Sequence, residues 1–215
     1  MSDVDQTSEI VVTAYSGRYV VAARHVLQIE GGFVNDPADR GGATKFGISL
    51  RFLMAEGAID LDEDGYADFD LDMDGDIDGV DIRGLTKGDA IYLFHRCFWQ
   101  RLECESFPFP IGEMMFDQGV NGGLFAARKL LQQAINRVLK TFSPSVPPIA
   151  VDGVIGPMTR IALDVLCDTD AGIERLADEY RAAARARYRA IVDANPSQRR
   201  FLVGWLNRAD RMGRY

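Results

Sequence analysis

Residues 30–49 read Glu-Gly-Gly-Phe-Val-Asn-Asp-Pro-Ala-Asp-Arg-Gly-Gly-Ala-Thr-Lys-Phe-Gly-Ile-Ser and follow directly on an apolar stripe. The stripe has the three- to four-residue spacing of an amphipathic helix: Tyr19, Ala22, Val26 and Ile29. Gly31 and Gly32 are typical of a helix end. Because residues 31–49 are rich in Gly, Asp and Pro, we predict an irregular loop or hairpin there, with a short strand around Phe46 and Ile48.

Glu30 is the residue of this stretch with the most specific chemistry. It stands four residues after Val26, at the edge of the apolar stripe. Partial burial and the negative end of the helix dipole would both raise the pKa of its carboxyl group. A glutamic acid that stays protonated near neutral pH can protonate a glycosidic oxygen. A lone Glu at a helix end is more often a surface residue, so the neighbouring residues decide between the two interpretations.

The stretch resembles the signature of glycoside hydrolase family 108, muramidases with a Glu-Gly-Gly-aromatic motif, and is similar in spacing to phage-type lysozymes. The resemblance implies that Glu30 is the general acid. It also implies Asp39 as a second carboxylate, which would stabilise an oxocarbenium-like centre or activate water, and Thr44 as the residue that holds that water. Asp36 is a rival for the second carboxylate. Turn formation is the alternative for both aspartates, because their sequence neighbours are good turn formers.

The same resemblance places further residues near a substrate. Phe33 fills the aromatic position of the motif. Tyr92 and Trp99 belong to the family's next helix, where aromatic rings can stack on sugars, although core packing is the more frequent use of such rings. Asp117 and Asn121 follow at the expected start of a second domain and would line a cleft, with helix capping or packing between domains as the alternative.

Periodicity and breakers predict a mainly α protein with a very small β element, and the resemblance implies a lysozyme-like α+β fold. We expect a flexible segment over 1–17, a helical catalytic domain over 18–115 and a helical peptidoglycan-binding domain over 116–215. Glycines at 119–123 should end a helix, and Thr86 with Asp89 resembles a capping box at the start of another. Further helices are predicted over 50–59, 86–98, 111–118, 124–139, 157–167, 170–193 and 197–210.

The C-terminal half resembles the predicted peptidoglycan-binding domain that usually follows this catalytic domain. Its Asp152-Gly153 pair, followed by Gly156-Pro157 and Thr159, should form a tight turn capped by Asp, with Pro157 starting a helix. Arginines recur through residues 175–214, which predicts a basic face suited to an anionic wall rather than to nucleic acid.

An acidic segment at residues 60–81 carries ten Asp, one Glu and no Lys or Arg, in a chain whose net charge is −8. Without this segment the chain carries +3, which suits a polyanionic target. Residues 70–81 resemble the EF-hand calcium loop in its dockerin variant, with carboxylates of Asp70, Asp72, Asp74, Asp78 and Asp81 at positions one, three, five, nine and twelve. Gly75 is at position six, and Asp76 at position seven would offer its carbonyl. A solvated acidic loop is the alternative.

A weaker copy of this loop begins ten residues earlier, with Asp60, Asp62 and Asp64 at positions one, three and five, Tyr66 at seven and Asp68 at nine. Position twelve is Leu71, which cannot bind a metal, so Asp70 is a substitute ligand. We therefore expect one or two calcium ions with a structural or regulatory role. The family does not generally carry this segment, so it is an insertion. The resemblance implies no cofactor for the chemistry itself.

The function expected from these patterns is an N-acetylmuramidase, which cleaves the β-1,4 bond between N-acetylmuramic acid and N-acetylglucosamine. A non-catalytic wall-binding or secretion-accessory protein and a lytic transglycosylase are the alternatives. No apolar run is long enough for a membrane span, the N-terminus lacks a secretory signal and the three cysteines form no disulfide framework. We expect a monomer made in the bacterial cytoplasm, which reaches the periplasm or cell wall through a holin, a secretion system or lysis.

Overall fold

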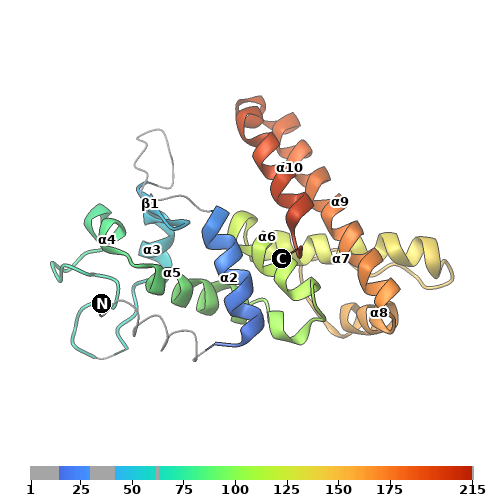
Figure 1. The fold of residues 1–215 in the computed structure, drawn as a ribbon, viewed down its shortest axis with the longest axis horizontal. Coiled ribbons are helices and arrows are strands. Elements are labelled where there is room, and N and C mark those ends of the chain that lie inside the picture. The colour runs from blue at the N-terminus through green and yellow to red at the C-terminus, as the bar shows by residue number, and fades with distance from the viewer. Residues whose placement is uncertain (1–14, 30–41, 62, 215) are drawn as a thin grey trace, which may run out of the picture. The chain divides into compact units, whose positions relative to one another are not determined.

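The computed structural model describes residues 15–29, 42–61 and 63–214, and the fold is mainly α, as predicted (Figure 1). Contacts within the chain divide it into two compact units, with the boundary in the sequence between Trp99 and Gln100. No helix among the described residues is long and apolar enough to span a membrane. The three cysteines are free thiols, with Cys97 and Cys104 buried and Cys167 half-buried.

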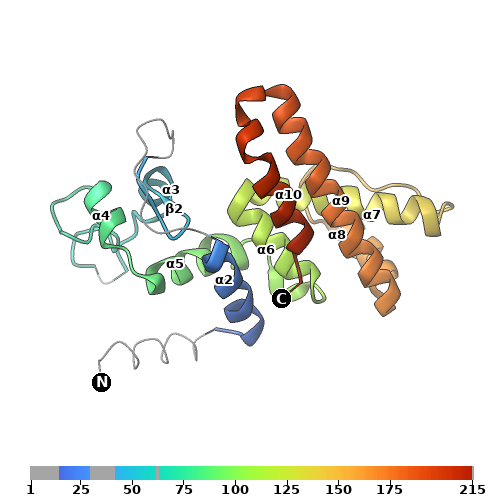
Figure 2. The ribbon, with the colours of Figure 1, turned by 45° about the horizontal axis from the view of Figure 1, so that its top comes forward.

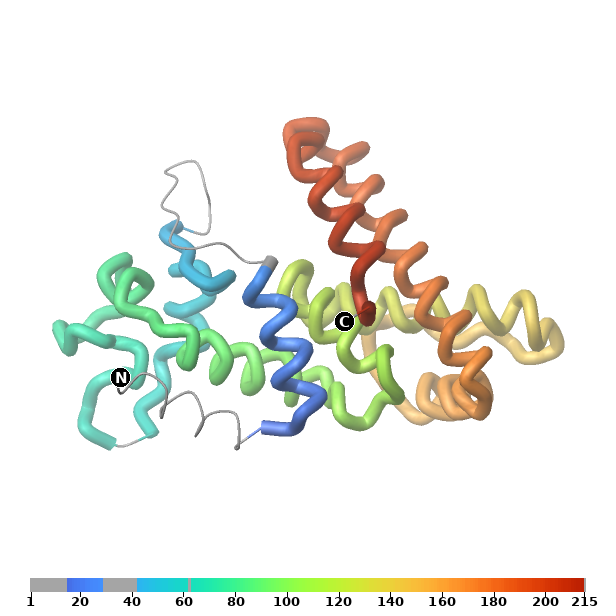
Figure 3. The backbone as a smooth tube through the Cα atoms, viewed as in Figure 1, coloured from blue at the N-terminus to red at the C-terminus, as the bar shows by residue number. Residues whose placement is uncertain are grey.

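The first unit combines short helices with one small hairpin. Its elements are α2 (Gly17–Ile29), β1 (Thr44–Lys45), β2 (Ile48–Ser49), α3 (Leu50–Glu56), α4 (Gly79–Gly84), α5 (Lys87–Phe94) and the π-helix η1 (His95–Gln100). The long connection between α3 and α4 is the acidic segment, which winds away from the helices as two successive loops (Figure 3).

The hairpin is the small β element that the sequence predicts. β1 and β2 pair antiparallel, with Thr44 opposite Ser49 and Lys45 opposite Ile48. Phe46 lies in the turn rather than in a strand, because Phe46 and Gly47 both have positive φ angles, 52° and 80°. Two consecutive left-handed residues match the right-handed twist of a two-residue hairpin. Ser49 then caps α3, because its side chain accepts a hydrogen bond from the Phe52 N–H.

The core of the first unit is built on the apolar stripe of α2. Tyr19, Ala22 and Val26 are fully buried, as their spacing predicts. The Tyr19 hydroxyl donates a hydrogen bond to the carbonyl of Ile91 in α5, and its ring packs 5.3 Å from that of Trp99 in η1. These contacts hold α2 against the continuous helix formed by α5 and η1.

The second unit is all helical. Its elements are the 3₁₀ turn η2 (Cys104–Ser106), α6 (Ile111–Gly122), α7 (Leu124–Phe142), α8 (Pro157–Cys167), α9 (Asp170–Ala194), the 3₁₀ turn η3 (Pro196–Phe201) and α10 (Leu202–Arg211). α9 and α10 lie side by side and run in opposite directions (Figures 1 and 2). α7 and α9 supply most of the core between them, through Leu131, Ile135, Ala177 and Tyr180.

The predicted helix end at residue 119 is wrong, because α6 continues to Gly122. The helix stops at Gly123, which lies within the predicted break at 119–123. Gly123 has a φ angle of +86°, which ends the helix. α6 is buried along most of its length, and this burial outweighs the weak helix propensity of glycine. Gly122 also makes room for a neighbour, since a Cβ there would lie 2.2 Å from Nε2 of Gln118.

A buried ion pair joins α6 to α10 in the second unit. Nε of Arg208 lies 2.7 Å from Oδ1 of Asp117, and the two side chains are 7% and 0% exposed. Beside this pair, the Tyr188 hydroxyl donates to Oε1 of Gln118, and Nδ2 of Asn121 donates to the Tyr188 hydroxyl. The polar network therefore connects α6, α9 and α10 inside an otherwise apolar core.

Removing one partner of this ion pair should destabilise the protein strongly. We expect Asp117→Ala to lower the free energy of unfolding by about 3–5 kcal/mol, because it leaves a buried guanidinium without its carboxylate. Urea unfolding measures this change. Asp210→Ala removes the exposed partner of Arg185 and should cost under about 1 kcal/mol.

The double variant Asp117→Leu with Arg208→Met tests the cause of that loss. It should recover most of the lost stability, because it removes both charges and fills a similar volume. A double variant as unstable as Asp117→Ala would show that shape, and not the uncompensated charge, dominates at this position.

Candidate functional site

The predicted catalytic stretch lies largely outside the described residues. Glu30, Phe33, Asp36 and Asp39 all fall in the range 30–41. The structure describes the elements on either side of this range in sequence, α2 before it and β1 after it. The described part of the candidate site is therefore the two elements that flank the motif.

Thr44 is the one predicted catalytic residue that the structure describes. It is half-buried in β1, and its hydroxyl donates to the carbonyl of Gly42 at 3.4 Å. The hairpin around it is held from two sides. The Leu50 N–H donates to the Ala43 carbonyl at 2.8 Å, and Nζ of Lys45 donates to the Arg83 carbonyl in α4 at 2.6 Å. The backbone of Thr44 is thus fixed by α3 and α4.

The two aromatic residues predicted to contact sugar are placed differently. Trp99 is 2% exposed and packs against Tyr19, which favours the core-packing alternative. Tyr92 is half-buried, and its ring stacks on that of Phe69 with centroids 6.2 Å apart. Tyr92 therefore links α5 to the acidic segment.

The second unit uses its predicted site residues for packing. Asp117 is enclosed by its ion pair with Arg208, and Asn121 binds Tyr188. The predicted basic face is wrong for Arg181 and Arg208, because both side chains are buried. Arg181 donates from Nε to the Met212 carbonyl at 3.0 Å and pairs with Asp178 at 2.8 Å.

The turn at residues 152–157 forms as the sequence predicts. Oδ1 of Asp152 accepts the Val154 N–H at 2.9 Å, Gly153 has a φ angle of +78°, and Pro157 begins α8. Gln132 in α7 fixes the turn from below, since its Nε2 donates to Asp152 and its Oε1 accepts the Gly153 N–H. These accepted hydrogen bonds lower the pKa of the Asp152 carboxyl group, the bond from Gln132 most of all.

The two acidic loops repeat the same hydrogen bonds ten residues apart, with Asp62 of the first loop lying outside the described residues. Asp60 accepts the N–H groups four and five residues later, and Asp70 does the same. Positions four and six have positive φ angles in both loops: Glu63 61°, Met73 57°, Gly65 93° and Gly75 97°. The weaker copy is therefore a true structural repeat of the stronger one.

The end of each loop is closed by an aspartate that reaches back to its second residue. Oδ1 of Asp81 accepts the Leu71 N–H at 2.6 Å, and Oδ1 of Asp68 accepts the Leu61 N–H at 2.9 Å. The first loop is thus a shortened version that ends at Asp68. The spacing in the sequence instead predicts that Asp70 completes it. Asp70 uses both carboxylate oxygens on N–H groups of its own loop.

Asp81 also anchors α4, which the sequence analysis does not predict. Its Oδ2 accepts the Asp78 N–H at 2.7 Å, while Asp78 accepts the Val80 N–H, so the two form a capping box. The spacing of Asp78 and Asp81 is the signal that could have indicated this helix. At 1% exposure, Asp81 is the most buried acidic side chain of the segment.

The second loop gathers carboxylate oxygens of Asp70, Asp72 and Asp74 within 4.8 Å of one another. Desolvation, followed by repulsion from Asp74, raises the pKa of the Asp72 carboxyl group. Hard oxygen donors at this spacing are the ligands that calcium takes in proteins. The residues present therefore fit a calcium ion chemically.

Comparison with known families accounts for nearly the whole chain. The model of the glycosyl hydrolase 108 family matches residues 23–123, and that of a predicted peptidoglycan domain matches residues 126–210. Residues 23–123 therefore form a glycosyl hydrolase 108 domain. The two domains together support peptidoglycan hydrolase activity.

A similar fold occurs in a solved structure, titled "Structure of Brucella abortus SagA". The two chains superpose with a TM-score of 0.60 at 23% identity, over 93% of this chain and 97% of that one. No curated protein matches the sequence. The glycosyl hydrolase 108 match extends through α6, whose contacts place it in the second compact unit.

Asp81 offers a local test of how the acidic segment of this glycosyl hydrolase 108 domain is held. In chelator, Asp81→Asn should speed amide hydrogen exchange at Leu71 or Asp78 by roughly tenfold or more, because an amide has one acceptor oxygen for two N–H donors. Hydrogen-exchange mass spectrometry across residues 60–84 measures it. Asp193→Asn, exposed on α9, is the control and should change nothing. Unaltered exchange in Asp81→Asn would contradict the anchoring role.

Proposed function

We propose that the protein is an N-acetylmuramidase, which hydrolyses the β-1,4 bond between N-acetylmuramic acid and N-acetylglucosamine with Glu30 as general acid. The observation that supports this most is the family match over residues 23–123, which includes the whole motif that starts at Glu30. The predicted peptidoglycan domain behind it supports the choice of substrate.

The proposed roles follow the order of the motif. Glu30 protonates the glycosidic oxygen of the leaving sugar. Asp39, with Asp36 as rival, stabilises the oxocarbenium-like centre or activates water, and Thr44 holds that water. The firm attachment of β1 to α3 and α4 is consistent with this, because a residue that positions water needs a fixed backbone.

The protein would act in the periplasm or cell wall after release by a holin, a secretion system or lysis, as a monomer. Apart from the acidic segment the chain carries a net positive charge, which favours approach to an anionic polymer.

We further propose that the acidic segment binds calcium in a structural or regulatory role. Asp70, Asp72, Asp74 and Asp81 would contribute side chains in the second loop, and Asp76 its carbonyl. The first loop, with Asp60, Asp62, Asp64 and the Tyr66 carbonyl, is the second site. The repeated loop conformation and the gathered carboxylates support this. A bound ion would relieve the repulsion among these carboxylates and fix the loops that precede α5.

Replacing the general acid should abolish most of the activity. We expect Glu30→Gln to slow the clearing of purified sacculi by roughly 10²- to 10⁴-fold, because glutamine has no proton to transfer to the leaving sugar. Turbidity measures the rate. Glu174→Gln, an exposed position on α9, is the matched control and should clear at the wild-type rate.

Two results would contradict this proposal. Equal clearing by Glu30→Gln and wild type would exclude Glu30 as the acid. Released fragments with 1,6-anhydro ends in mass spectrometry would make the protein a lytic transglycosylase, whereas reducing ends are expected for hydrolysis.

Calcium should raise the melting temperature of the wild-type protein, and EGTA should reverse the rise. The double variant Asp72→Asn with Asp74→Asn should lose the part of the response that comes from the second loop, because it removes two anionic ligands there. The side-chain oxygen of an asparagine at position 74 can still accept the hydrogen bond from the Asp76 N–H. Differential scanning fluorimetry measures both proteins.

The control for calcium is Asp193→Asn, which should keep the full response. A wild-type melting temperature that does not change with calcium would refute the metal site. The melting temperature does not depend on wall cleavage. The calcium proposal and the muramidase proposal can therefore fail separately.

A further inference from the structure

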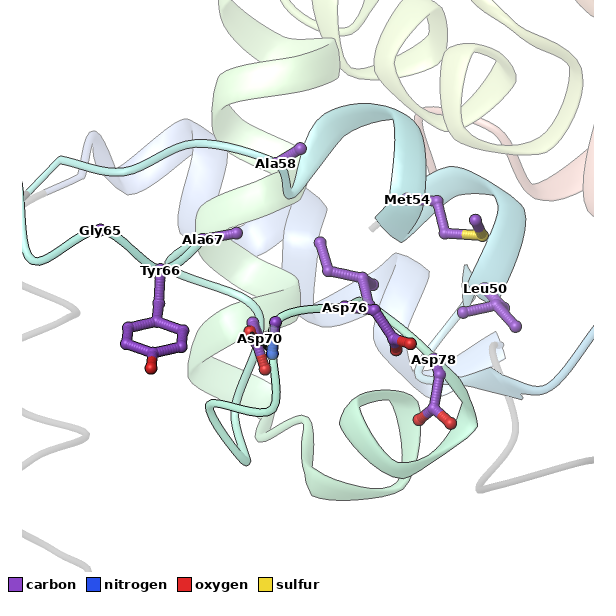
Figure 4. A pocket seen from close by; sticks show the side chains of 11 residues that line it. Leu50, Met54, Ala58, Gly65, Tyr66, Ala67, Asp70, Asp76 and Asp78 are labelled. Atoms are coloured by element: carbon purple, nitrogen blue, oxygen red, sulfur yellow. Dashed lines mark hydrogen bonds between the residues drawn. The ribbon is translucent and has the colours of Figure 1, made fainter.

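A cavity of about 610 Å³ lies between α3 and the two acidic loops (Figure 4). α3 forms one wall through Leu50 and Met54. The first loop contributes Tyr66 and its neighbours, and the second loop contributes residues 75–78. All of these residues belong to the first compact unit. This volume is in the range of small-ligand sites and can accept one or two side chains of a peptide.

The lining of the cavity is mainly apolar. Leu50, Met54 and Ile77 line it together with Ala58 and Ala67, and Met54 is 57% exposed. The acidic segment thus leaves one side of α3 uncovered at this point. A set of apolar side chains around a hollow favours an occupant with an apolar part of its own.

All the charged residues of the lining are acidic: Asp70, Asp76 and Asp78. Asp76 and Asp78 lie on the same side of the cavity as Leu50 and Met54 (Figure 4). The Asp78 carboxylate caps α4 by accepting N–H groups of its first turn, and no group among the described residues donates a hydrogen bond to the Asp76 carboxylate. In the proposed calcium loop Asp76 contributes its backbone carbonyl, so its side-chain charge stays directed at the cavity.

We infer that this cavity is a docking site for a basic peptide segment that presents Lys or Arg next to an apolar residue. The long aliphatic stem of Lys or Arg would lie along Leu50, Met54 and Ile77, and its cationic group would reach Asp76 and Asp78. Charge complementarity decides the occupant, because residues 60–81 carry eleven acidic side chains and no basic one.

The same charge argues against a wall glycan in this cavity. The polymer is anionic, and the acidic segment repels it, while the rest of the chain is net positive. The docking site is therefore a function additional to the proposed wall cleavage. It selects a cationic protein partner at a part of the chain that is an insertion in the catalytic domain.

The probe for this site is a capped hexapeptide of alternating Leu and Lys, titrated in calcium-containing buffer and followed by calorimetry. We expect saturable binding that weakens as salt rises. The variant Asp76→Asn with Asp78→Asn should weaken binding about five- to tenfold, since each exposed ion pair contributes little. Asparagine at 78 still caps α4. Asp193→Asn should bind the peptide as the wild type does.

Two further probes separate charge from shape. Hexapeptides of alternating Leu and Glu, and of alternating Gly and Lys, should each bind at least tenfold more weakly than the Leu-Lys peptide. Met54→Ser should weaken binding of the Leu-Lys peptide and leave the affinity for the Gly-Lys peptide unchanged. Equal melting temperatures of variants and wild type would confirm that each protein is folded.

Three outcomes would overturn the inference. The Gly-Lys peptide could bind as tightly as the Leu-Lys peptide, which would show that binding is non-specific charge attraction without a contribution from the apolar lining. Excess calcium could abolish peptide binding, which would make the Asp76 carboxylate a metal ligand. A chitin oligosaccharide could displace the peptide, which would make the cavity a glycan subsite. Equal clearing of sacculi by Glu30→Gln and wild type would contradict the muramidase proposal but would leave the inference intact.

Discussion

The first unit depends on the packing of Tyr19 against the α5–η1 helix. Its side chain is fully buried, so an unmade hydroxyl hydrogen bond there would cost about 1–3 kcal/mol. The hydroxyl reaches the carbonyl of Ile91, which the N–H of His95 also approaches. At His95 the regular α-helix gives way to the π-helix η1. A side chain that enters a helix's hydrogen-bond ladder is a known cause of such local change.

This contact matters for the proposed chemistry because it fixes α2 up to Ile29. A general acid that follows a helix is only as well placed as the helix itself, and a small displacement of reacting groups costs much of the rate. On the other side of the motif, the hairpin holds Thr44 through backbone hydrogen bonds to α3 and a lysine contact to α4. The two flanks of the catalytic motif are therefore held by different parts of the first unit.

Local chemistry made much of this fold predictable. The stripe of α2, the Thr86–Asp89 capping box and the Asp152 turn each depend on residues within one or two helical turns, and all three form as expected. The continuation of α6 through Gly119 could not be predicted in this way, because tertiary burial decides it. The charged residues show the same limit. Arg208 looks like part of a basic surface in the sequence, but its partner Asp117 is 91 residues away.

The acidic segment shows how a repeat is recognised best by its hydrogen bonds. Sequence spacing aligns Asp68 with position nine of a calcium loop and leaves position twelve empty. The hydrogen bond from the Leu61 N–H instead aligns Asp68 with Asp81, which accepts the equivalent N–H of Leu71. A shortened loop that closes with its own aspartate leaves Asp70 to the next loop.

Because the two loops share no closing residue, each can hold its conformation without borrowing a side chain from the other. The cavity beside α3 is formed between them, so its shape depends on both loops being ordered at once. A cation that neutralises the loop interior would leave the outward-facing Asp76 and Asp78 as the remaining negative charges at that cavity. In this arrangement one acidic segment would separate two electrostatic roles: carboxylates turned inward hold the loops, and carboxylates turned outward are available to the proposed partner.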